Sequence, residues 1–233
     1  MPLDHGHPLS RRAALRGAGL AAASLAAATL AACTTPTPPR SPEPDGPSTS
    51  TGTPVNPSPS SARVLVAYFS RAGENYWYGD RRTLETGNTE VLAGMISDRI
   101  DCDVYSIEAA DPYPEAYDPT VARNSEEQDT DARPEIANPL PDLSAYDTVL
   151  LGSPIWNVQP PMIMATFVEA LDLSGKDVRP FVTYAVSGLG STAAFYSDLV
   201  PGARLGQGLA VQGEEVAESA TDLDQWLAAA GLA

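Results

Sequence analysis

The run Arg63-Val-Leu-Val-Ala-Tyr-Phe69 decides the fold of this chain of 233 residues. After Arg63 the run is apolar without a break, whereas a strand with one face in water alternates apolar and polar side chains. The run therefore predicts a strand that is covered on both faces. Such strands belong to parallel sheets, in which helices connect successive strands and pack on both sides.

Helices and further strands alternate after this run, as a parallel sheet requires. Apolar runs predict four more strands, at 103–108, 148–152, 179–186 and 208–213. Apolar residues at helical spacing predict helices at 89–100, 161–171 and 218–230, with a further helix around 121–129. The sequence thus predicts an α/β fold: a doubly wound five-stranded parallel sheet with helices on both faces and right-handed crossovers.

The segment before the sheet is typical of an export signal. Residues 1–33 contain the pair Arg11-Arg12, then an uncharged stretch, and end in Leu30-Ala-Ala-Cys33. The arginine pair resembles a twin-arginine signal, and the ending resembles the lipobox of bacterial lipoproteins, in which Cys33 would be lipidated. We therefore expect an exported protein that is lipid-anchored to the outer face of the cytoplasmic membrane. The alternative is a plain secretory signal with a coincidental cysteine.

A low-complexity segment separates this signal from the predicted sheet. Residues 34–61 hold nine prolines, 12 Ser or Thr, and Val55 as their one apolar residue. Such a composition cannot form a core, so the segment is predicted to be a disordered tether. The remaining 172 residues, 62–233, are long enough for one globular domain.

Charge and composition exclude several functions for residues 62–233. This segment has 10 basic and 27 acidic residues, a formal net charge of −17, which disfavours binding to nucleic acid or anionic lipid. Both histidines, His5 and His7, precede it, so no histidine can serve there as a base or metal ligand. The single remaining cysteine, Cys102, cannot form an internal disulfide. We predict no metal site, no catalytic side chain, and membrane contact through the lipid anchor only.

Three loops at the carboxyl ends of the predicted strands suggest a ligand site, because ligands of doubly wound sheets bind there. Ser70-Arg71 follows the first strand, and Thr86-Gly-Asn-Thr89 opens the first helix. Hydroxyls and free amides at a helix start favour a phosphate, although an ordinary turn with a helix cap has the same composition. The absence of a Walker lysine favours a monophosphate.

The other two loops suggest a flat ring. Trp156 lies between prolines in the loop after the third strand, where it could stack on an aromatic ligand. The loop after the fourth strand, 187–191, is rich in glycine, which lets a ligand approach the backbone closely. Together the three loops predict a phosphate at one end of the site and a ring system at the other.

These residues resemble the flavodoxin family, in the branch with a Tyr-Phe-Ser-Arg-x-Gly start and a Gly-x-Pro-Ile-Trp loop. The resemblance covers 63–232 and implies a flavodoxin-like fold with noncovalently bound flavin mononucleotide (FMN). It implies that the phosphate is held by Ser70, Arg71, Thr86, Gly87, Asn88 and Thr89. It also implies that the isoalloxazine ring is lined by Pro154, Ile155, Trp156 and Asn157, and supported at its polar edge by Ser187, Gly188 and Gly190.

Two segments leave alternatives open. The insertion Glu74–Glu85 is either a lid over the flavin, or a contact for a nicotinamide or quinone, or else an Ω-like loop that packs its own aromatics. Tyr113, in a second long excursion, could approach the ring. Residues 188–193 match a loose dinucleotide fingerprint, but they follow the fourth strand and have no acidic residue about 20 positions on.

Three functions are compatible with these features. The favoured one is an FMN-binding electron-transfer protein, tethered outside the cytoplasm, which exchanges electrons with a redox partner protein or a small electron acceptor. The second is an FMN-dependent NAD(P)H quinone or nitro reductase, and the third is a non-redox lipoprotein binding module. Outer-sphere electron transfer needs no acid or base from the protein, which agrees with the lack of histidine.

Overall fold

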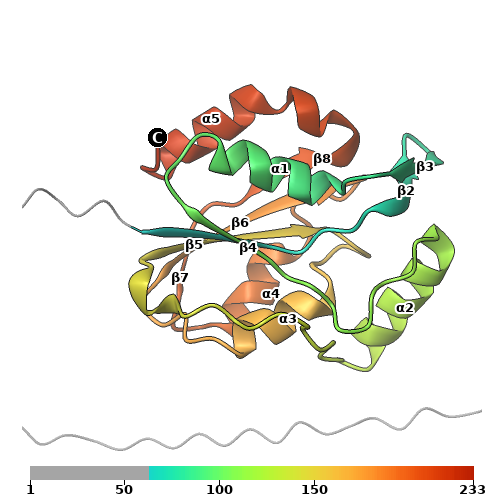
Figure 1. Ribbon diagram of the computed structural model, residues 1–233, viewed down its shortest axis with the longest axis horizontal. Helices are drawn as coiled ribbons and strands as arrows, with labels where there is room; N and C mark the ends of the chain where they lie inside the picture. The colour runs from blue at the N-terminus through green and yellow to red at the C-terminus, as the bar shows by residue number, and fades with distance from the viewer. Residues whose placement is uncertain (1–62) are drawn as a thin grey trace, which may run out of the picture. The chain divides into compact units, whose positions relative to one another are not determined.

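Six parallel strands form the central sheet of the computed structural model, which describes residues 63–233 (Figure 1). The strands are β1 (Val64–Tyr68), β4 (Asp103–Ser106), β5 (Thr148–Pro154), β6 (Asp177–Tyr184), β7 (Arg204–Leu205) and β8 (Leu209–Gln212). Their order is β4-β1-β5-β6-β7, with β8 also paired to β6. The predicted doubly wound parallel sheet is confirmed. The predicted export signal 1–33 and the tether 34–61 lie outside the described residues.

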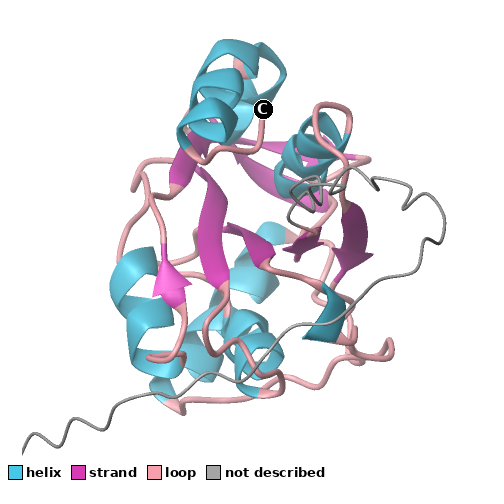
Figure 2. Cartoon of the chain, turned by 90° about the vertical axis from the view of Figure 1, so that its left-hand side faces the viewer, coloured by secondary structure: helices cyan, strands magenta, loops and turns pink. Residues whose placement is uncertain are grey.

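Helices cover both faces of this sheet (Figures 1 and 2). One face carries α1 (Asn88–Ser97) and α5 (Ala220–Ala229), and the other carries α3 (Met162–Glu169) and α4 (Thr192–Leu199). Val64, Val66 and Tyr68 pack into the α1/α5 core, while the residues between them pack into the opposite core. This alternation explains why the first strand has an unbroken apolar sequence.

Two helices differ from the sequence-based expectation. The helix expected around 121–129 is α2 (Tyr117–Asp129), which lies beside α3 and buries the polar residues Thr120, Asn124 and Glu127. Helix α4 was not predicted, because it is short and directly follows the glycine-rich turn 187–191.

The predicted fifth strand, 208–213, is β8, and an unpredicted short strand, β7, precedes it beside β6, so the sheet has six strands instead of five. Pro180 explains why β7 and β8 are separate. β7 pairs with the start of β6 and β8 with its end. The Gly206 N–H donates to the Val178 carbonyl, so Val178 directs its backbone groups toward this side of β6. Two residues later Pro180 faces the same side but has no N–H to offer, and the ladder is interrupted there.

The inserted segment after β1 is a β-hairpin rather than an Ω-like loop. β2 (Gly73–Trp77) pairs with β3 (Asp80–Leu84) in an antiparallel ladder. Its two turn residues, Tyr78 and Gly79, both have positive φ, 48° and 93°, as two-residue hairpin loops of type I′ require. Trp77 and Tyr78 do pack edge to face, with ring centroids 5.8 Å apart.

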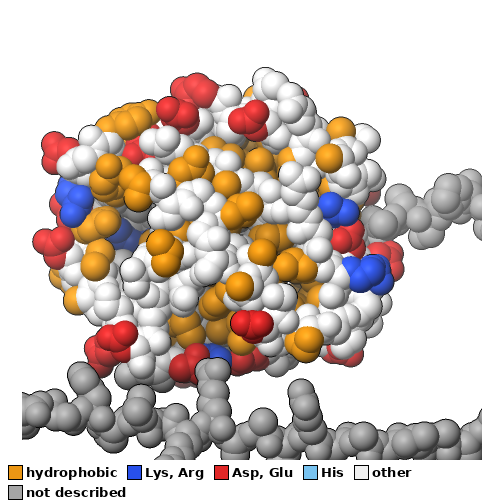
Figure 3. All heavy atoms as spheres, turned by 180° about the vertical axis from the view of Figure 1, so that it is seen from behind, with side chains coloured by type: hydrophobic (Ala, Val, Ile, Leu, Met, Phe, Trp, Pro, Cys, Tyr) orange, Lys and Arg blue, Asp and Glu red, His pale blue; other side chains and the backbone are white. Residues whose placement is uncertain are grey.

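The surface of this domain reflects its acidic composition. Asp and Glu side chains surround the face seen in Figure 3, and Lys and Arg side chains are few. Across residues 63–233, none of the helices combines the length and the apolar character needed to cross a bilayer.

Candidate functional site

Two adjoining pockets lie at the carboxyl ends of β1, β5 and β6. The first, here called the α1 pocket, lies at the start of α1 and has a volume of about 90 Å³. The second, here called the α2 groove, lies between α2 and the loops after β5 and β6, with a volume of about 400 Å³. The residues common to both walls are Arg71, Asn75, Tyr117, Ile155, Trp156 and Ala185. The pockets therefore form one continuous site for an elongated ligand.

Most of the predicted site residues lie on these walls. The α1 pocket and the α2 groove together include Ser70, Arg71, Asn88, Thr89, Pro154, Ile155, Trp156, Asn157 and Ser187. The other four predicted residues, Thr86, Gly87, Gly188 and Gly190, do not line either pocket.

The start of α1 offers hydrogen-bond donors to the α1 pocket. The first amides of a helix have no acceptor within it, and its dipole favours a negative group there. Ser70 accepts one of these amides: its Oγ is 3.1 Å from the Glu90 nitrogen. The N–H groups of Asn88 and Thr89 remain for a ligand. This arrangement suits an anion such as a phosphate.

Gly87 brings the two halves of the phosphate turn together despite the inserted hairpin. A Cβ on Gly87 would lie 2.3 Å from Ser70 Oγ and 2.6 Å from the Arg71 carbonyl oxygen. Only a glycine permits this approach of the β1 loop to the helix start. Gly87 is thus a contact between protein segments, while Thr86 is exposed.

Thr89 contributes to the pocket through its backbone. Its side chain is buried, and its hydroxyl shares a hydrogen bond of 2.7 Å with the hydroxyl of Thr183 at the end of β6. This bond ties the start of α1 to β6. The amide of Thr89, and not its hydroxyl, is therefore the group available to a ligand.

Arg71 fastens neighbouring segments from within the site. Its guanidinium donates to the carbonyl oxygens of Pro114 at 2.9 Å and Glu115 at 3.0 Å, and to that of Glu74. Burial lowers the pKa of this guanidinium, and Glu74 opposes the shift. Its Nε is buried and has no partner among the described residues. A ligand oxygen could satisfy this nitrogen, since Arg71 lines both pockets.

Trp156, which with Tyr117 is one of two aromatic residues common to both pockets, is held by two other rings. Its ring lies edge-on to Phe69 at 5.7 Å and to Tyr113 at 5.2 Å between centroids. Its carbonyl oxygen accepts a hydrogen bond from Gln128 Nε2 of α2 at 3.0 Å. A tryptophan fixed in this way is preorganised to stack on a flat ring.

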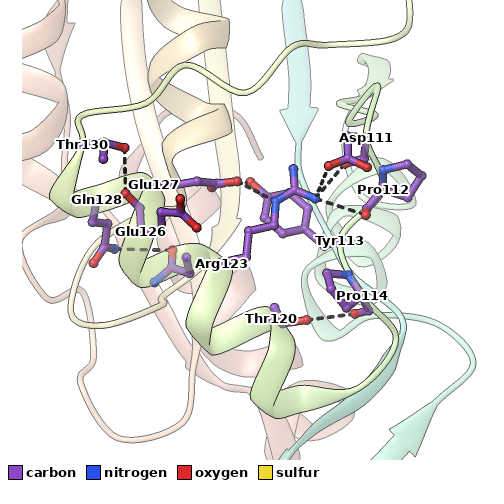
Figure 4. Close-up of polar contacts among 11 residues, drawn as sticks. Asp111, Pro112, Tyr113, Pro114, Thr120, Arg123, Glu126, Glu127, Gln128 and Thr130 are labelled. Atoms are coloured by element: carbon purple, nitrogen blue, oxygen red, sulfur yellow. Dashed lines mark hydrogen bonds and ion pairs between the residues drawn. The ribbon is translucent and has the colours of Figure 1, made fainter.

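Tyr113 packs edge-on against Trp156 and does not line either pocket. Figure 4 shows its polar surroundings: the hydroxyl donates to Glu127 Oε2 at 2.8 Å, and the Arg123 guanidinium lies 3.9 Å above the ring. Arg123 also donates to Glu127 at 2.7 Å. Burial raises the pKa of Tyr113, and the bond to Glu127 raises it further. Tyr113 is therefore a buried neutral brace.

The glycine-rich loop after β6 packs against the tryptophan loop. A Cβ on Gly190 would lie 2.1 Å from the Val158 carbonyl oxygen, which accepts the Ser191 N–H at 2.8 Å. Gly190 is the second glycine of the loose dinucleotide fingerprint, the position at which a pyrophosphate would approach. Because Gly190 contacts protein there, this geometry disfavours the dinucleotide alternative.

Backbone strain accompanies this contact. Asn157 and Val158 have φ values of 49° and 65°, which non-glycine residues rarely adopt and β-branched residues least of all. The Asn157 side chain donates to Gln128 Oε1 of α2 at 2.7 Å. Strain of this kind is typical of ligand-binding loops.

Several residues on the pocket walls were not predicted from the sequence. Asn75 and Tyr76 come from the hairpin, Tyr117 from the start of α2, and Glu214 from the 3₁₀ helix η2 (Gly213–Glu218). Thr183 and Tyr184 also line the α1 pocket. Ligands of doubly wound sheets bind beyond the strand ends. These last two residues would therefore have been predicted if the sequence analysis had ended this strand at Tyr184 instead of at 186.

These features define a doubly wound α/β protein whose site suits a ligand with an anionic end and a flat ring. Residues 63–230 match the family model described as flavodoxin, and the chain belongs to the flavodoxin family. Family membership supports the FMN cofactor that the resemblance implied.

Solved structures agree with this family. A protein from Bacteroides uniformis assigned as a flavoprotein is 30% identical, with a TM-score of 0.59, over 72% of this chain and 98% of its own. One from Bacteroides eggerthii, assigned in the same way, is 28% identical, with a TM-score of 0.57, over 72% and 97%. A flavoprotein from Lactobacillus acidophilus in complex with FMN shares the fold at 18% identity and a TM-score of 0.51, over 71% and 98%. Among curated proteins there was no match.

Proposed function

We propose that this chain is an FMN-binding electron-transfer protein that works outside the cytoplasm, anchored by a lipid on Cys33. The observation that carries the FMN part is the continuous site with helix amides at one end and Trp156 at the other. FMN, when bound, supplies the electron-carrying chemistry, and the protein supplies binding and orientation.

The residues of this site fit the two ends of FMN. At the α1 pocket the amides of Asn88 and Thr89 and the Ser70 hydroxyl would hold the phosphate. In the α2 groove Trp156 would stack on the ring, with Asn157 and Ser187 near its polar edge. The described residues contain no histidine, so none of these groups is suited to carry a proton near neutral pH.

An apolar rim around the α2 groove supports electron exchange at this place. Val121, Val158 and Val186 line the groove from three different elements and are 44%, 55% and 79% exposed. Exposed apolar side chains at the mouth of a site favour a docking partner. A redox protein or a small electron acceptor could approach the ring here without crossing the protein.

The proposed export and anchoring are supported by the sequence pattern of residues 1–33 and the composition of 34–61. The test is Cys33→Ser in the organism's own export system. We expect this variant to leave the membrane fraction, while the control variant Thr34→Ser stays there. Equal membrane association of both would contradict lipid anchoring at Cys33.

The test of FMN binding is the visible absorption spectrum of freshly purified protein, followed by titration of the apoprotein with FMN and with riboflavin. Trp156→Ala should weaken both ligands about tenfold, because stacking on either ring is lost. Ser70→Ala should weaken FMN and leave riboflavin nearly unchanged, because riboflavin has no phosphate. A protein that is colourless and does not bind added FMN would contradict the proposal.

A second function, an FMN-dependent NAD(P)H quinone or nitro reductase, is favoured by one observation. The α2 groove has a volume of about 400 Å³, and within residues 63–233 Arg71 is the one charged residue on its wall. A small neutral acceptor could enter such a groove. Steady oxidation of NADH or NADPH in the presence of a quinone would favour this function over the electron carrier.

A further inference from the structure

We propose that the β2–β3 hairpin is a strap over the phosphate end of the bound flavin nucleotide, closed by a clasp between its tip and Glu214. This inference rests on the proposed binding of FMN. It assigns Asn75 and Tyr76 of the hairpin as ligand-contacting residues and Glu214 as the residue that holds the strap.

The hairpin forms part of the wall of the α1 pocket. Asn75 and Tyr76 of β2 line this pocket together with Asn88 at the start of α1. Asn75 also lines the α2 groove, so the hairpin borders the site along both of its parts. In Figure 1 the hairpin lies beyond the start of α1, on the side of the sheet edge where α2 begins.

The root of the hairpin is firmly attached. The Glu74 N–H donates to the Glu115 carbonyl oxygen at 2.8 Å, and the Tyr117 N–H donates to the Glu74 carboxylate at 2.9 Å. Gly73 has a φ of 83°, and a Cβ there would lie 2.7 Å from the Glu115 carbonyl oxygen. Together with the bonds of Arg71, these contacts fix the first residues of β2 to the loop before α2.

The middle of the hairpin is held less firmly. The Arg81 guanidinium lies 3.6 Å above the Tyr117 ring, a cation–π contact. Arg81 also forms an ion pair of 3.9 Å with Asp118, whose side chain is 92% exposed, so this pair contributes little. The Tyr117 ring, which lines both pockets, is thus covered by the hairpin.

The tip has one polar attachment. Within the described part of the chain, a single hydrogen bond joins residues 77–80 to another element: the Tyr78 N–H donates to Glu214 Oε1 at 2.9 Å. Gly79 at the turn has no neighbour within 4 Å of where its Cβ would lie. A root with many contacts and a tip with one hydrogen bond describe a strap that can open at the tip.

Glu214 has a second property, because it also lines the α1 pocket. A phosphate bound at the helix start would carry a negative charge close to this carboxylate. Glu214 therefore closes the strap through its oxygen and opposes the phosphate through its charge. Burial and then Glu215, Glu214 and Glu218 raise the pKa of the Tyr78 phenol. This effect concerns the side chain, whereas among the described residues the Tyr78 N–H bonds to Glu214 alone.

Two substitutions separate these properties. Glu214→Gln keeps a carbonyl oxygen that can accept the Tyr78 N–H but removes the charge. Glu214→Ala removes both. Glu215→Gln is the matched control, because Glu215 is an exposed neighbour on η2 that does not line the pocket.

The experiment measures the rate of FMN release from each holoprotein by stopped-flow fluorescence, with riboflavin as the ligand without phosphate. Loss of one hydrogen bond predicts that Glu214→Ala releases FMN about five- to tenfold faster than Glu214→Gln. Glu214→Gln should release FMN no faster than the unmodified protein, and Glu215→Gln should release it at the unmodified rate. Equal rates for Glu214→Ala and Glu214→Gln would overturn the clasp.

Hydrogen exchange of the Tyr78 amide in the apoprotein gives a readout that does not depend on the ligand. We expect protection of this amide in the unmodified protein and in Glu214→Gln, and its loss in Glu214→Ala. Unchanged protection in Glu214→Ala would overturn the clasp even if FMN binds. If Glu214→Ala loses this protection but the unmodified protein does not bind FMN, the proposed function and the role of the strap in FMN binding are overturned. The contact between Tyr78 and Glu214 would still be supported.

Discussion

Single residues without a Cβ determine how the segments around the site meet. Gly87 lets the β1 loop touch the start of α1, and Gly190 lets the β6 loop touch Val158. The sequence predicted both glycines as parts of the site, where they would approach a ligand. In the structure their close contacts are with protein atoms instead. A glycine in the sequence indicates that something approaches the backbone closely, but it does not show whether a ligand or another protein segment does so.

Gly152 provides a sharp test at this scale. It lies inside β5, where a Cβ would be 2.2 Å from the Phe181 ring and 2.7 Å from Tyr68 Cβ. We expect Gly152→Ala to lower the free energy of unfolding by about 1–3 kcal/mol, because the core around it would be overpacked. Chemical denaturation measures this loss.

The matched control is Gly94→Ala in α1. Gly94 is exposed, and a Cβ there would have no neighbour within 4 Å. This substitution should raise the free energy of unfolding by about 0.5–1 kcal/mol, since alanine favours helix more than glycine does. Equal effects of the two substitutions would contradict the packing described for Gly152.

At the scale of secondary-structure elements, buried strands were the most predictable feature. β1 is apolar throughout and β5 contains the apolar run Val149–Leu151, so their sequences alone indicated strands covered on both faces. The hairpin was missed because its residues show no apolar alternation, and because Tyr78 occupies a turn position where asparagine or glycine is usual. Its contribution to the site depends on contacts with α2 and η2, which no local pattern contains.

Gly79→Ala tests whether the shape of the hairpin matters for binding. Gly79 has a φ of 93°, a conformation that alanine adopts only with strain, and a Cβ there would meet no neighbour. We expect a several-fold weaker affinity for FMN with little change in the unfolding midpoint, because the hairpin lies outside the core.

The control for this prediction is Gly175→Ala. Gly175 also has a positive φ, 73°, and open space around it, but it lies in the loop before β6, away from both pockets. Strain alone should leave the affinity for FMN unchanged at this position. An equal loss of affinity in both variants would show that the hairpin has no special role.

At the scale of the whole molecule, buried tyrosines determine how stability responds to high pH. Burial raises the pKa of Tyr113 and of Tyr196. A tyrosine whose pKa is raised by folding stabilises the protein fully below the pKa of the unfolded chain, about 10, and this stabilisation is lost as the pH rises above it. The domain should therefore lose stability steeply above pH 10.

Tyr113→Phe isolates one of these groups. The phenylalanine ring keeps the contacts with Trp156 and Phe69 and has no proton to lose. Between pH 9 and 11 the unmodified protein should lose about 1.4 kcal/mol more unfolding free energy than Tyr113→Phe. Denaturation curves across this pH range measure the difference, and parallel losses would show that Tyr113 ionises in the folded protein.

The interruption at Pro180 also protects the molecule from self-association. An open sheet edge can pair with a strand from a second chain, and long, flat edges are the most prone to such pairing. Here one edge is divided into segments of two and four residues, β7 and β8. The opposite edge, β4, has four residues, and the Asn138 side chain occupies the Ser106 carbonyl at its end. Neither border therefore offers an incoming strand an uninterrupted row of backbone partners, and a proline that weakens one ladder guards against polymerisation.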